Sequence, residues 1–206
     1  MSSSSRNYHH GNLRAELVSA ALDMLDTQTA ASLSLRQVAQ QAGVSHNAPY
    51  YHFADRTAML EAVGVEAMRR FVAAQRDAIE RATGPRDALL EMGAAYVGWA
   101  ADHPGAFAVI YDPEICDPRE PSDAMAPLIR ENEALLHAAT RAAASAAAGP
   151  AAGAASPAQE GEVRMEPIEI ALWGMVHGLA VLHVAGHFPA EAIRPALEAS
   201  LSRLGV

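Results

Sequence analysis

Apolar residues recur every three or four positions along most of the chain, which is the spacing of an α-helix with one buried face. In the first such stripe, Leu13, Leu17, Ala21 and Met24 fall on one side. Polar or Pro-containing stretches separate the stripes. The pattern predicts helices over residues 13–25, 35–42, 45–52, 56–82, 86–101, 103–111, 123–144, 166–187 and 190–204.

Helix-start signals follow one another closely in the N-terminal third. Ser34 and Gln37 have the spacing of a capping box, and Gly43 can supply the left-handed residue that ends the short helix before it. Ser45 can then cap a third helix, and Asp55 a long fourth one. A short helix, a Gly-centred turn and a new helix cap in this order have the spacing of a helix-turn-helix.

Composition favours an all-α fold. Hydrophobic residues make up 50% of the 206 residues and aromatic residues only 5%, and Ala, which costs no side-chain entropy in a helix, is abundant. Residues 145–163 are rich in Ala, Gly, Pro and Ser without an apolar face, so we expect a flexible linker there. The single Cys excludes a disulfide framework within the chain. The polar first residues are unlike a secretory signal peptide, and we expect a soluble, cytoplasmic protein.

The net negative charge of the chain comes from its later part. Residues 1–56 hold four Arg and four acidic residues, so the net charge of −9 falls on residues 57–206. The helix predicted to open at Ser45 carries no acidic residue and presents polar and aromatic side chains, among them Asn47. A helix N-terminus attracts phosphate, and Asn can bind adenine through two hydrogen bonds. These features are typical of a recognition helix in the major groove of DNA.

Two segments resemble a known family. Residues 34–60 resemble the helix-turn-helix of the TetR family of transcriptional regulators, and residues 8–14 resemble a lead-in common in that family. Residues 173–178, Trp-Gly-Met-Val-His-Gly, resemble the Trp…His-Gly signature of its WHG type of C-terminal domain.

The resemblance implies an all-α protein of two domains, with about nine helices in all. A three-helix DNA-binding domain would occupy residues 11–71, with its helix-turn-helix at 34–53. A helical ligand-binding and dimerisation domain would occupy residues 72–206 and contain the linker.

The resemblance also assigns DNA contacts, position by position. Arg36 matches a position on the second helix that often contacts DNA, and Arg56 falls where the family commonly has a Lys that grips a phosphate. Pro49 departs from the family, which more usually has a branched aliphatic residue there, and it removes a hydrogen bond at the start of the helix. The implied DNA-binding residues are Arg36, Ser45, His46, Asn47, Tyr50, Tyr51, His52 and Arg56.

The segment 170–190 carries no Asp, Glu or Arg over a length that could span a membrane. Its three His, three Gly and one Pro argue against a span, so we expect no membrane association. Such a helix can instead pack one face on its own domain and the other on a second subunit, as the family resemblance also implies. The expected homodimer interface consists of Gly174, Gly178, Val181, Ile193, Leu197 and Leu201.

A regulator that senses its own effector needs a pocket in the C-terminal domain. Mostly apolar lining with a few polar groups suggests an apolar or amphipathic small molecule. The candidate ligand-binding residues are Met92, Tyr96, Trp99, Phe107, Ile110, Tyr111, Leu128, Met175 and His177.

Together these features predict a sequence-specific DNA-binding regulator, a repressor that a small effector releases from a double-stranded DNA operator. The alternative is a ligand-binding helical dimer that acts through a protein partner without specific DNA recognition. We expect neither enzyme activity nor a cofactor, because the sequence has no nucleophile elbow, phosphate loop or paired carboxylates. His183 and His187 are spaced like two metal ligands on a helix, but no carboxylate or Cys accompanies them, and we expect no metal.

Overall fold

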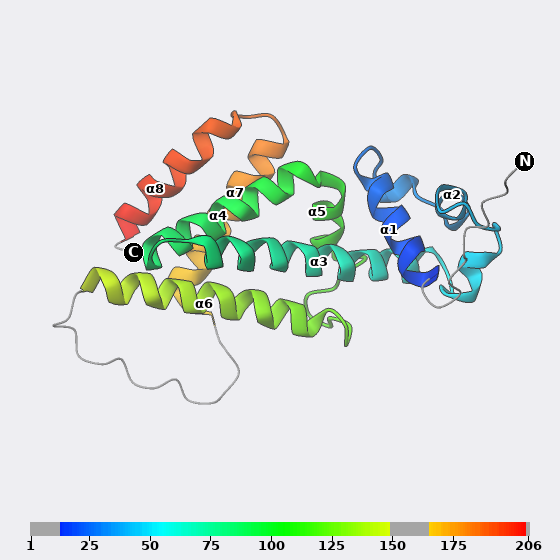
Figure 1. Ribbon diagram of the computed structural model, residues 1–206, viewed down its shortest axis with the longest axis horizontal. Helices are drawn as coiled ribbons and strands as arrows, with labels where there is room; N and C mark the ends of the chain where they lie inside the picture. The colour runs from blue at the N-terminus through cyan, green and yellow to red at the C-terminus, as the bar shows by residue number, and fades with distance from the viewer. Residues whose placement is uncertain (1–12, 149–164, 205–206) are drawn as a thin grey trace, which may run out of the picture.

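The computed structural model describes residues 13–148 and 165–204, and all regular secondary structure in these ranges is helical. Figure 1 shows an elongated molecule with α1 and α2 at one end and α4, α6, α7 and α8 gathered at the other. The α-helices are α1 (Leu13–Leu25), α2 (Leu35–Gln41), α3 (Arg56–Arg81), α4 (Pro85–Asp102), α5 (Pro104–Ile110), α6 (Ala126–Ala148), α7 (Pro167–Val184) and α8 (Ile193–Leu204). Three short 3₁₀ helices are η1 (Ala30–Ser32), η2 (Ala48–Tyr51) and η3 (Ala190–Ala192).

Local capping signals form as predicted. The Ser34 hydroxyl accepts a hydrogen bond from the Gln37 amide at 3.3 Å, and the Asp55 carboxylate accepts one from the Ala58 amide at 2.8 Å. Gly43 ends α2 with a φ of +69°, in the left-handed region where a side chain is strained. The start of the long helix α3 is therefore set by the sequence around Asp55.

Residues 13–63, which we call the head, pack around a small filled core. The side chains of this core are at most 2% exposed: Leu17 and Leu25 of α1, Val38 of α2, and Met59 and Val63 of α3. Because α1 contacts both α2 and α3, the head is held on the N-terminal part of α3.

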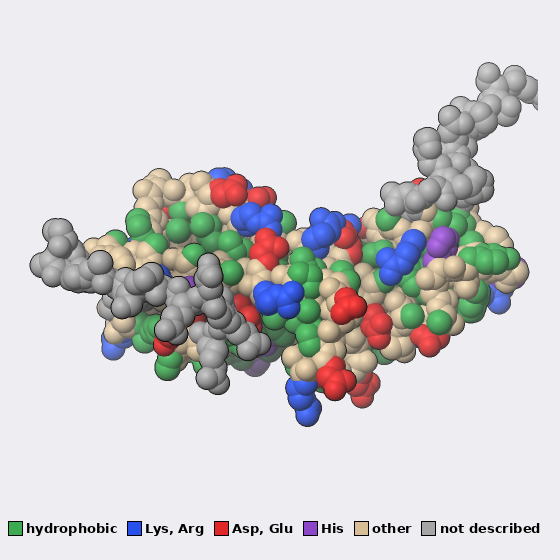
Figure 2. Space-filling view, turned by 90° about the horizontal axis from the view of Figure 1, so that it is seen from below, with side chains coloured by type: hydrophobic (Ala, Val, Ile, Leu, Met, Phe, Trp, Pro, Cys, Tyr) green, Lys and Arg blue, Asp and Glu red, His purple; other side chains and the backbone are tan. Residues whose placement is uncertain are grey.

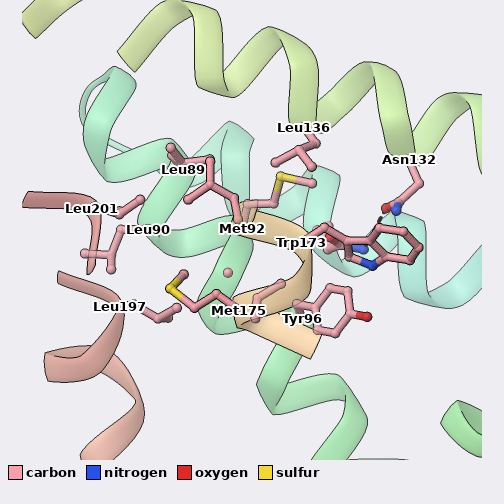
Figure 3. A pocket seen from close by; sticks show the side chains of 14 residues that line it. Leu89, Leu90, Met92, Tyr96, Asn132, Leu136, Trp173, Met175, Leu197 and Leu201 are labelled. Atoms are coloured by element: carbon pink, nitrogen blue, oxygen red, sulfur yellow. Dashed lines mark hydrogen bonds between the residues drawn. The ribbon is translucent and has the colours of Figure 1, made fainter. Parts of the chain in front are cut away.

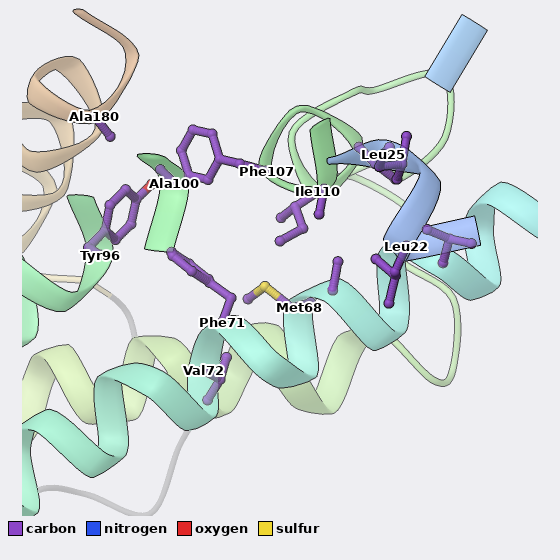
Figure 4. Packing of buried hydrophobic residues seen from close by; sticks show 14 of the residues in the cluster. Leu22, Leu25, Met68, Phe71, Val72, Tyr96, Ala100, Phe107, Ile110 and Ala180 are labelled. Carbon is purple, nitrogen blue, oxygen red and sulfur yellow. The ribbon is translucent and has the colours of Figure 1, made fainter. Parts of the chain in front are cut away.

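Residues 64–148 and 165–204, which we call the body, are arranged around α4, which packs against α3, α5, α6, α7 and α8. The predicted domain boundary between residues 71 and 72 falls inside the continuous helix α3, where both Phe71 and Val72 are fully buried. Figure 4 shows Phe71 pointing toward Tyr96 and Phe107, while Leu22 and Leu25 lie at the head end of the same apolar layer. The head and the body therefore share one spine, α3.

Some of the predicted helix and linker bounds need correction, and others fall outside the described residues. The predicted linker begins too early, because α6 continues through Ala148, where the Ala-rich sequence still favours a helix. The rest of that linker, to residue 163, and the lead-in at 8–12 lie outside the described residues. Of the nine predicted helices, the one over 45–52 is only the short 3₁₀ helix η2.

A close backbone contact joins head and body a second time. At Gly105, in the first turn of α5, an added Cβ would lie 2.2 Å from the carbonyl oxygen of Leu25, at the end of α1. Only Gly permits this approach. Beside it, the His103 ring lies 3.6 Å from the Asp26 carboxylate. The C-terminus of α1 therefore rests directly on the start of α5.

Candidate DNA-binding surface and ligand cavity

The predicted recognition helix is short and tightly wound. Ala48 donates its amide to the Ser45 carbonyl at 2.9 Å, and Tyr50 donates to Asn47 at 3.2 Å, both in the three-residue steps of a 3₁₀ helix. Pro49 has no N–H to donate and is itself buried. The expectation that an α-helix opens at Ser45 is therefore wrong: regular winding begins only after Asn47, and the residues before it form a turn.

Most of the predicted DNA contacts lie on the surface of the head. Tyr51 is 87% exposed and Tyr50 is 59% exposed, a high exposure for aromatic side chains of a folded domain. Figure 2 shows apolar and His side chains on the surface at the head end of the molecule. The other exposed members of the predicted set are Arg36, Ser45, His46, Asn47 and His52.

Arg56 is engaged inside the head. Its Nε donates to the Leu33 carbonyl at 2.8 Å, and one of its terminal nitrogens donates to the Ala30 carbonyl. The guanidinium thus holds the loop between α1 and α2 against the start of α3. This structural role is additional to the phosphate contact that the family resemblance implies.

The body contains a cavity of about 290 Å³ among α3, α5, α6, α7 and the loop that follows α5. We call it the wide lobe. Three of its lining residues, Asn132, Leu136 and Trp173, also line a narrower cavity of about 40 Å³ bounded by α4 and α8, which we call the narrow lobe. In Figure 3, Trp173 lies between Tyr96 and Asn132, while the Leu and Met side chains of the narrow lobe extend toward α8. The wide lobe is lined by Met68, Ile110, Tyr111, Pro113, Cys116, Asp117, Pro118, Met125, Ile129, Asn132, Glu133, Leu136, Met165 and Trp173.

A buried polar network stands beside the cavity. The Tyr96 hydroxyl lies 2.7 Å from the Tyr111 hydroxyl and 2.9 Å from His177 Nδ1. Burial raises the pKa of both phenols and lowers the pKa of His177, so all three groups are favoured in their neutral forms. On the α3 side, Gln75 donates to the Asn132 side chain at 3.0 Å. These bonds fix the polar part of the wall.

The predicted ligand-binding residues divide into three groups. Met92, Tyr96 and Met175 line the narrow lobe, and Ile110 and Tyr111 line the wide lobe. Phe107 and His177 lie behind the residues that line the cavity, with ring centroids 4.6–6.3 Å from those of the neighbouring aromatic rings.

Two of the predicted positions face elsewhere. Trp99 lies on another side of α4, in a surface hollow with Leu22 and Asp23 of α1, so helix rotation turns it from the cavity. Leu128 packs on the core, and its neighbour Ile129 lines the cavity instead.

Sequence reasoning missed the residues that join the two lobes. Trp173 belongs to the family signature but to none of the predicted ligand contacts, and Asn132 and Leu136 belong to no predicted site. An Asn on the apolar side of a long helix was the available signal for α6, because a buried amide needs a polar partner.

The two C-terminal helices bury different faces from those expected. Leu197 and Leu201 of α8 are 2% and 3% exposed, and an added Cβ on Gly93 of α4 would lie 3.4 Å from Leu197. Together with Ile193 they pack into their own subunit, so their assignment to the dimer interface is corrected: the apolar stripe of α8 finds its partner in α4.

The outer face of α7 remains apolar and exposed. Gly174 and Gly178 have open space beside them, and Val181 is 47% exposed. Among the described residues, α7 alone has the length and mean hydropathy (1.4) of a membrane span. Its inner face packs on α4. The other large apolar side chains exposed on α7 are Ile170, Trp173, Leu182 and Val184.

Two family models match separate parts of the chain. Residues 17–63 match the family model described as bacterial regulatory proteins of the tetR family. Residues 89–204 match the model described as a tetracyclin repressor-like C-terminal domain. No curated protein matches significantly.

Solved structures resemble most of the chain. One is a protein of unknown function from Rhodococcus sp. RHA1, with a TM-score of 0.70 and 30% identity over 96% of this chain and 97% of that one. A putative transcriptional regulator from Pseudomonas aeruginosa PAO1 has a TM-score of 0.64 and 22% identity, over 93% of this chain and 89% of that one. A TetR family transcriptional regulator from Thermus thermophilus has a TM-score of 0.60 and 18% identity, over 88% of this chain and 94% of that one.

The two family models cover the helix-turn-helix head and most of the cavity-bearing body. Members of this family bind DNA and regulate transcription, and they are not enzymes. The chain belongs to the TetR family of DNA-binding transcriptional regulators and carries a WHG-type C-terminal domain.

Proposed function

We propose that the protein is a homodimeric repressor that leaves its operator when a small amphipathic molecule occupies the cavity. The observation that carries this proposal is the double attachment of the head to the cavity wall. Met68 of α3 lines the wide lobe, and the same helix carries Met59 and Val63 in the core of the head. A displacement of α3 at Met68 therefore moves the head.

The short helix α5 supplies the second attachment. Its last residue, Ile110, lines the wide lobe, and Gly105 in its first turn touches the backbone of Leu25 in α1. A ligand that prefers one position of α5 over another also prefers one position of α1. By linkage, such a ligand weakens operator binding by the same factor that the operator weakens ligand binding.

The outer face of α7 is the proposed dimer contact. Gly174 and Gly178 let a second helix approach closely, and Val181 supplies apolar area beside them. An exposed apolar face of this size on a soluble protein is typical of a subunit interface. Two copies related by a twofold axis place two heads on one side, as binding to two half-sites requires. Such a DNA-binding protein acts in the cytoplasm.

The proposed DNA contacts are the exposed members of the predicted set. Asn47 and His46 would contact base edges, and Arg36, Tyr50 and His52 would contact the phosphate backbone. Ser45 and Tyr51 lie on the same exposed segment and complete the surface. Arg56 would contribute a phosphate contact only through donors not used in the head.

Genome-wide binding of the tagged protein tests this proposal, followed by affinity measurement on the enriched sequence. We expect a palindromic operator and a lower base preference for the variant Asn47→Ala, by about 1–3 kcal/mol at one position in each half-site. The variant Ser32→Ala, at an exposed position in η1 outside the proposed contacts, is the matched control. Binding without an enriched sequence would instead support the alternative, a ligand-binding dimer that acts through a protein partner.

A further inference from the structure

The charged lining of the wide lobe is of one sign. Asp117 and Glu133 line it, and among the described residues that line either lobe there is no Arg or His. The chain contains no Lys at all. Glu133 already interacts with another group of the protein, so Asp117 carries the available negative charge. A carboxylate or phosphate ligand that contacts these described lining residues would lose its water without a cation among them to pair with, which is strongly unfavourable.

Further carboxylates lie close to Cys116, which lines the wide lobe. Burial, and after it the charges of Glu61 and Asp112, raises the pKa of the Cys116 thiol to about 11. Cys116 lines the wide lobe and also an adjoining surface hollow that Glu114 and Glu120 line. Several carboxylates therefore lie on the loop side of the wide lobe.

The uncharged lining suits a large organic group. Tyr111 and Trp173 offer aromatic rings, whose faces attract cations. Met68, Met125 and Met165 supply flexible, polarisable side chains that adapt to different shapes. The narrow lobe beyond Leu136 is lined mainly by Leu, Met and Val, which favour hydrocarbon.

We propose that the ligand of this cavity is an amphipathic organic cation. Its amine or quaternary ammonium group lies in the wide lobe near Asp117, Tyr111 and Trp173, and its apolar part passes Asn132 toward the narrow lobe. This inference names the ligand class of the site in the proposed function and rests on that proposal only for the regulatory role of the ligand.

Calorimetry of the full-length protein at neutral pH with three probes of equal chain length tests the inference. The probes are decyltrimethylammonium and decanoate, each below its micelle concentration, and decanol below its solubility limit. We expect the cation to bind about tenfold more tightly than the alcohol, which is the contribution of cation–aromatic and carboxylate contacts in a partly desolvated site. Decanoate should bind more weakly than the alcohol.

Two matched variants locate the charge effect. Asp117→Asn keeps an oxygen for the Arg119 amide, which donates to Asp117 at 2.8 Å, and so removes the charge without removing the turn. It should lower the affinity for the cation several-fold and leave that for decanol unchanged. Glu120→Gln removes an equal charge from the same loop, at a residue that does not line the wide lobe, and should lower the cation-to-alcohol ratio less than Asp117→Asn does.

The outcomes separate this inference from the proposed function. Equal or tighter binding of decanoate, binding of none of the probes, or an unchanged cation affinity in Asp117→Asn would overturn the ligand class. Tight cation binding that depends on Asp117 but leaves operator affinity unaltered would support the ligand class and contradict the regulatory role.

Discussion

The head and the body are both built from Ala- and Leu-rich helices, but the head has a filled interior and the body has a cavity. The head fills its interior with Leu17, Leu25, Val38 and Met59 and exposes Tyr50 and Tyr51 on its surface. The body leaves a cavity of about 290 Å³ in its interior and an apolar face on the outside of α7. The difference teaches where the proposed specificity lies: for DNA on the surface of the head, and for a ligand in the interior of the body.

A second contrast lies within the body. Helices α7 and α8 both carry apolar stripes, yet that of α8 is buried against α4, whereas α7 keeps Val181 and its neighbours exposed. Introducing one carboxylate on each helix tests this contrast. The loss of stability from a carboxylate on the buried face of α8 is the largest effect that we predict.

Leu197→Glu should lower the free energy of unfolding of the body by on the order of 4 kcal/mol, because it buries a carboxylate without a partner. Val181→Glu should leave the helix content unchanged and convert the dimer to a monomer. Circular dichroism during urea unfolding and light scattering after size exclusion measure the two effects. A folded, stable Leu197→Glu protein, or a dimeric Val181→Glu protein, would show that we have assigned the two faces wrongly.

Gly105→Ala should destabilise the joint between head and body by about 1–3 kcal/mol, because the new Cβ meets the Leu25 carbonyl at 2.2 Å and forces α1 and α5 apart. Gly98→Ala is the control, since Gly98 lies within α4 with open space beside it. That variant should be stabilised by about 0.5–1 kcal/mol, the usual gain of Ala over Gly in a helix. Equal effects of the two variants on thermal unfolding would argue against a tight joint.

Arg56 and Arg36 should separate stability from DNA binding. Arg56→Ala removes the donors to the Leu33 and Ala30 carbonyls and should destabilise the head by about 1–3 kcal/mol. Arg36→Ala should leave stability unchanged and reduce the slope of log affinity against log salt by about one unit. If Arg36→Ala leaves both affinity and salt slope unaltered, α2 does not contact the operator through this residue.

His177 gives the smallest predicted effect, a dependence of stability on pH. Burial lowers its pKa below the ordinary value of 6.5, so the unfolded chain binds the proton more readily than the folded protein does. Stability should therefore be constant above about pH 6.5 and fall as the pH drops from there toward the lowered pKa of the folded state. His177→Asn, which can still bond to Tyr96, should lessen this fall in urea unfolding, and an identical pH profile in both proteins would contradict it.

The parts of the molecule that the sequence could predict are those decided by neighbouring residues. The cap at Ser34, the left-handed Gly43 and the start of α3 at Asp55 depend on side chains within a few positions, and the structure has all three. The sequence did not predict the 3₁₀ winding of η2, although Pro49 indicated a disturbed first turn.

The errors concern which neighbour a helix face meets. A stripe such as that of Leu197 and Leu201 shows that a face is buried, but not whether α4 or another subunit buries it. Trp99 and Trp173 likewise differ only in the direction that their helices turn them, which long-range packing decides. The cavity walls come from helices far apart in sequence, so no local pattern could assign them together.

The measurement that most directly tests the coupling of cavity and head is operator affinity of the dimer with and without a saturating ligand that calorimetry has located in the cavity. We predict that the ligand weakens operator binding by about 5- to 150-fold, and that operator DNA weakens ligand binding by the same factor. An operator affinity that stays unchanged while the cavity is fully occupied would contradict this coupling.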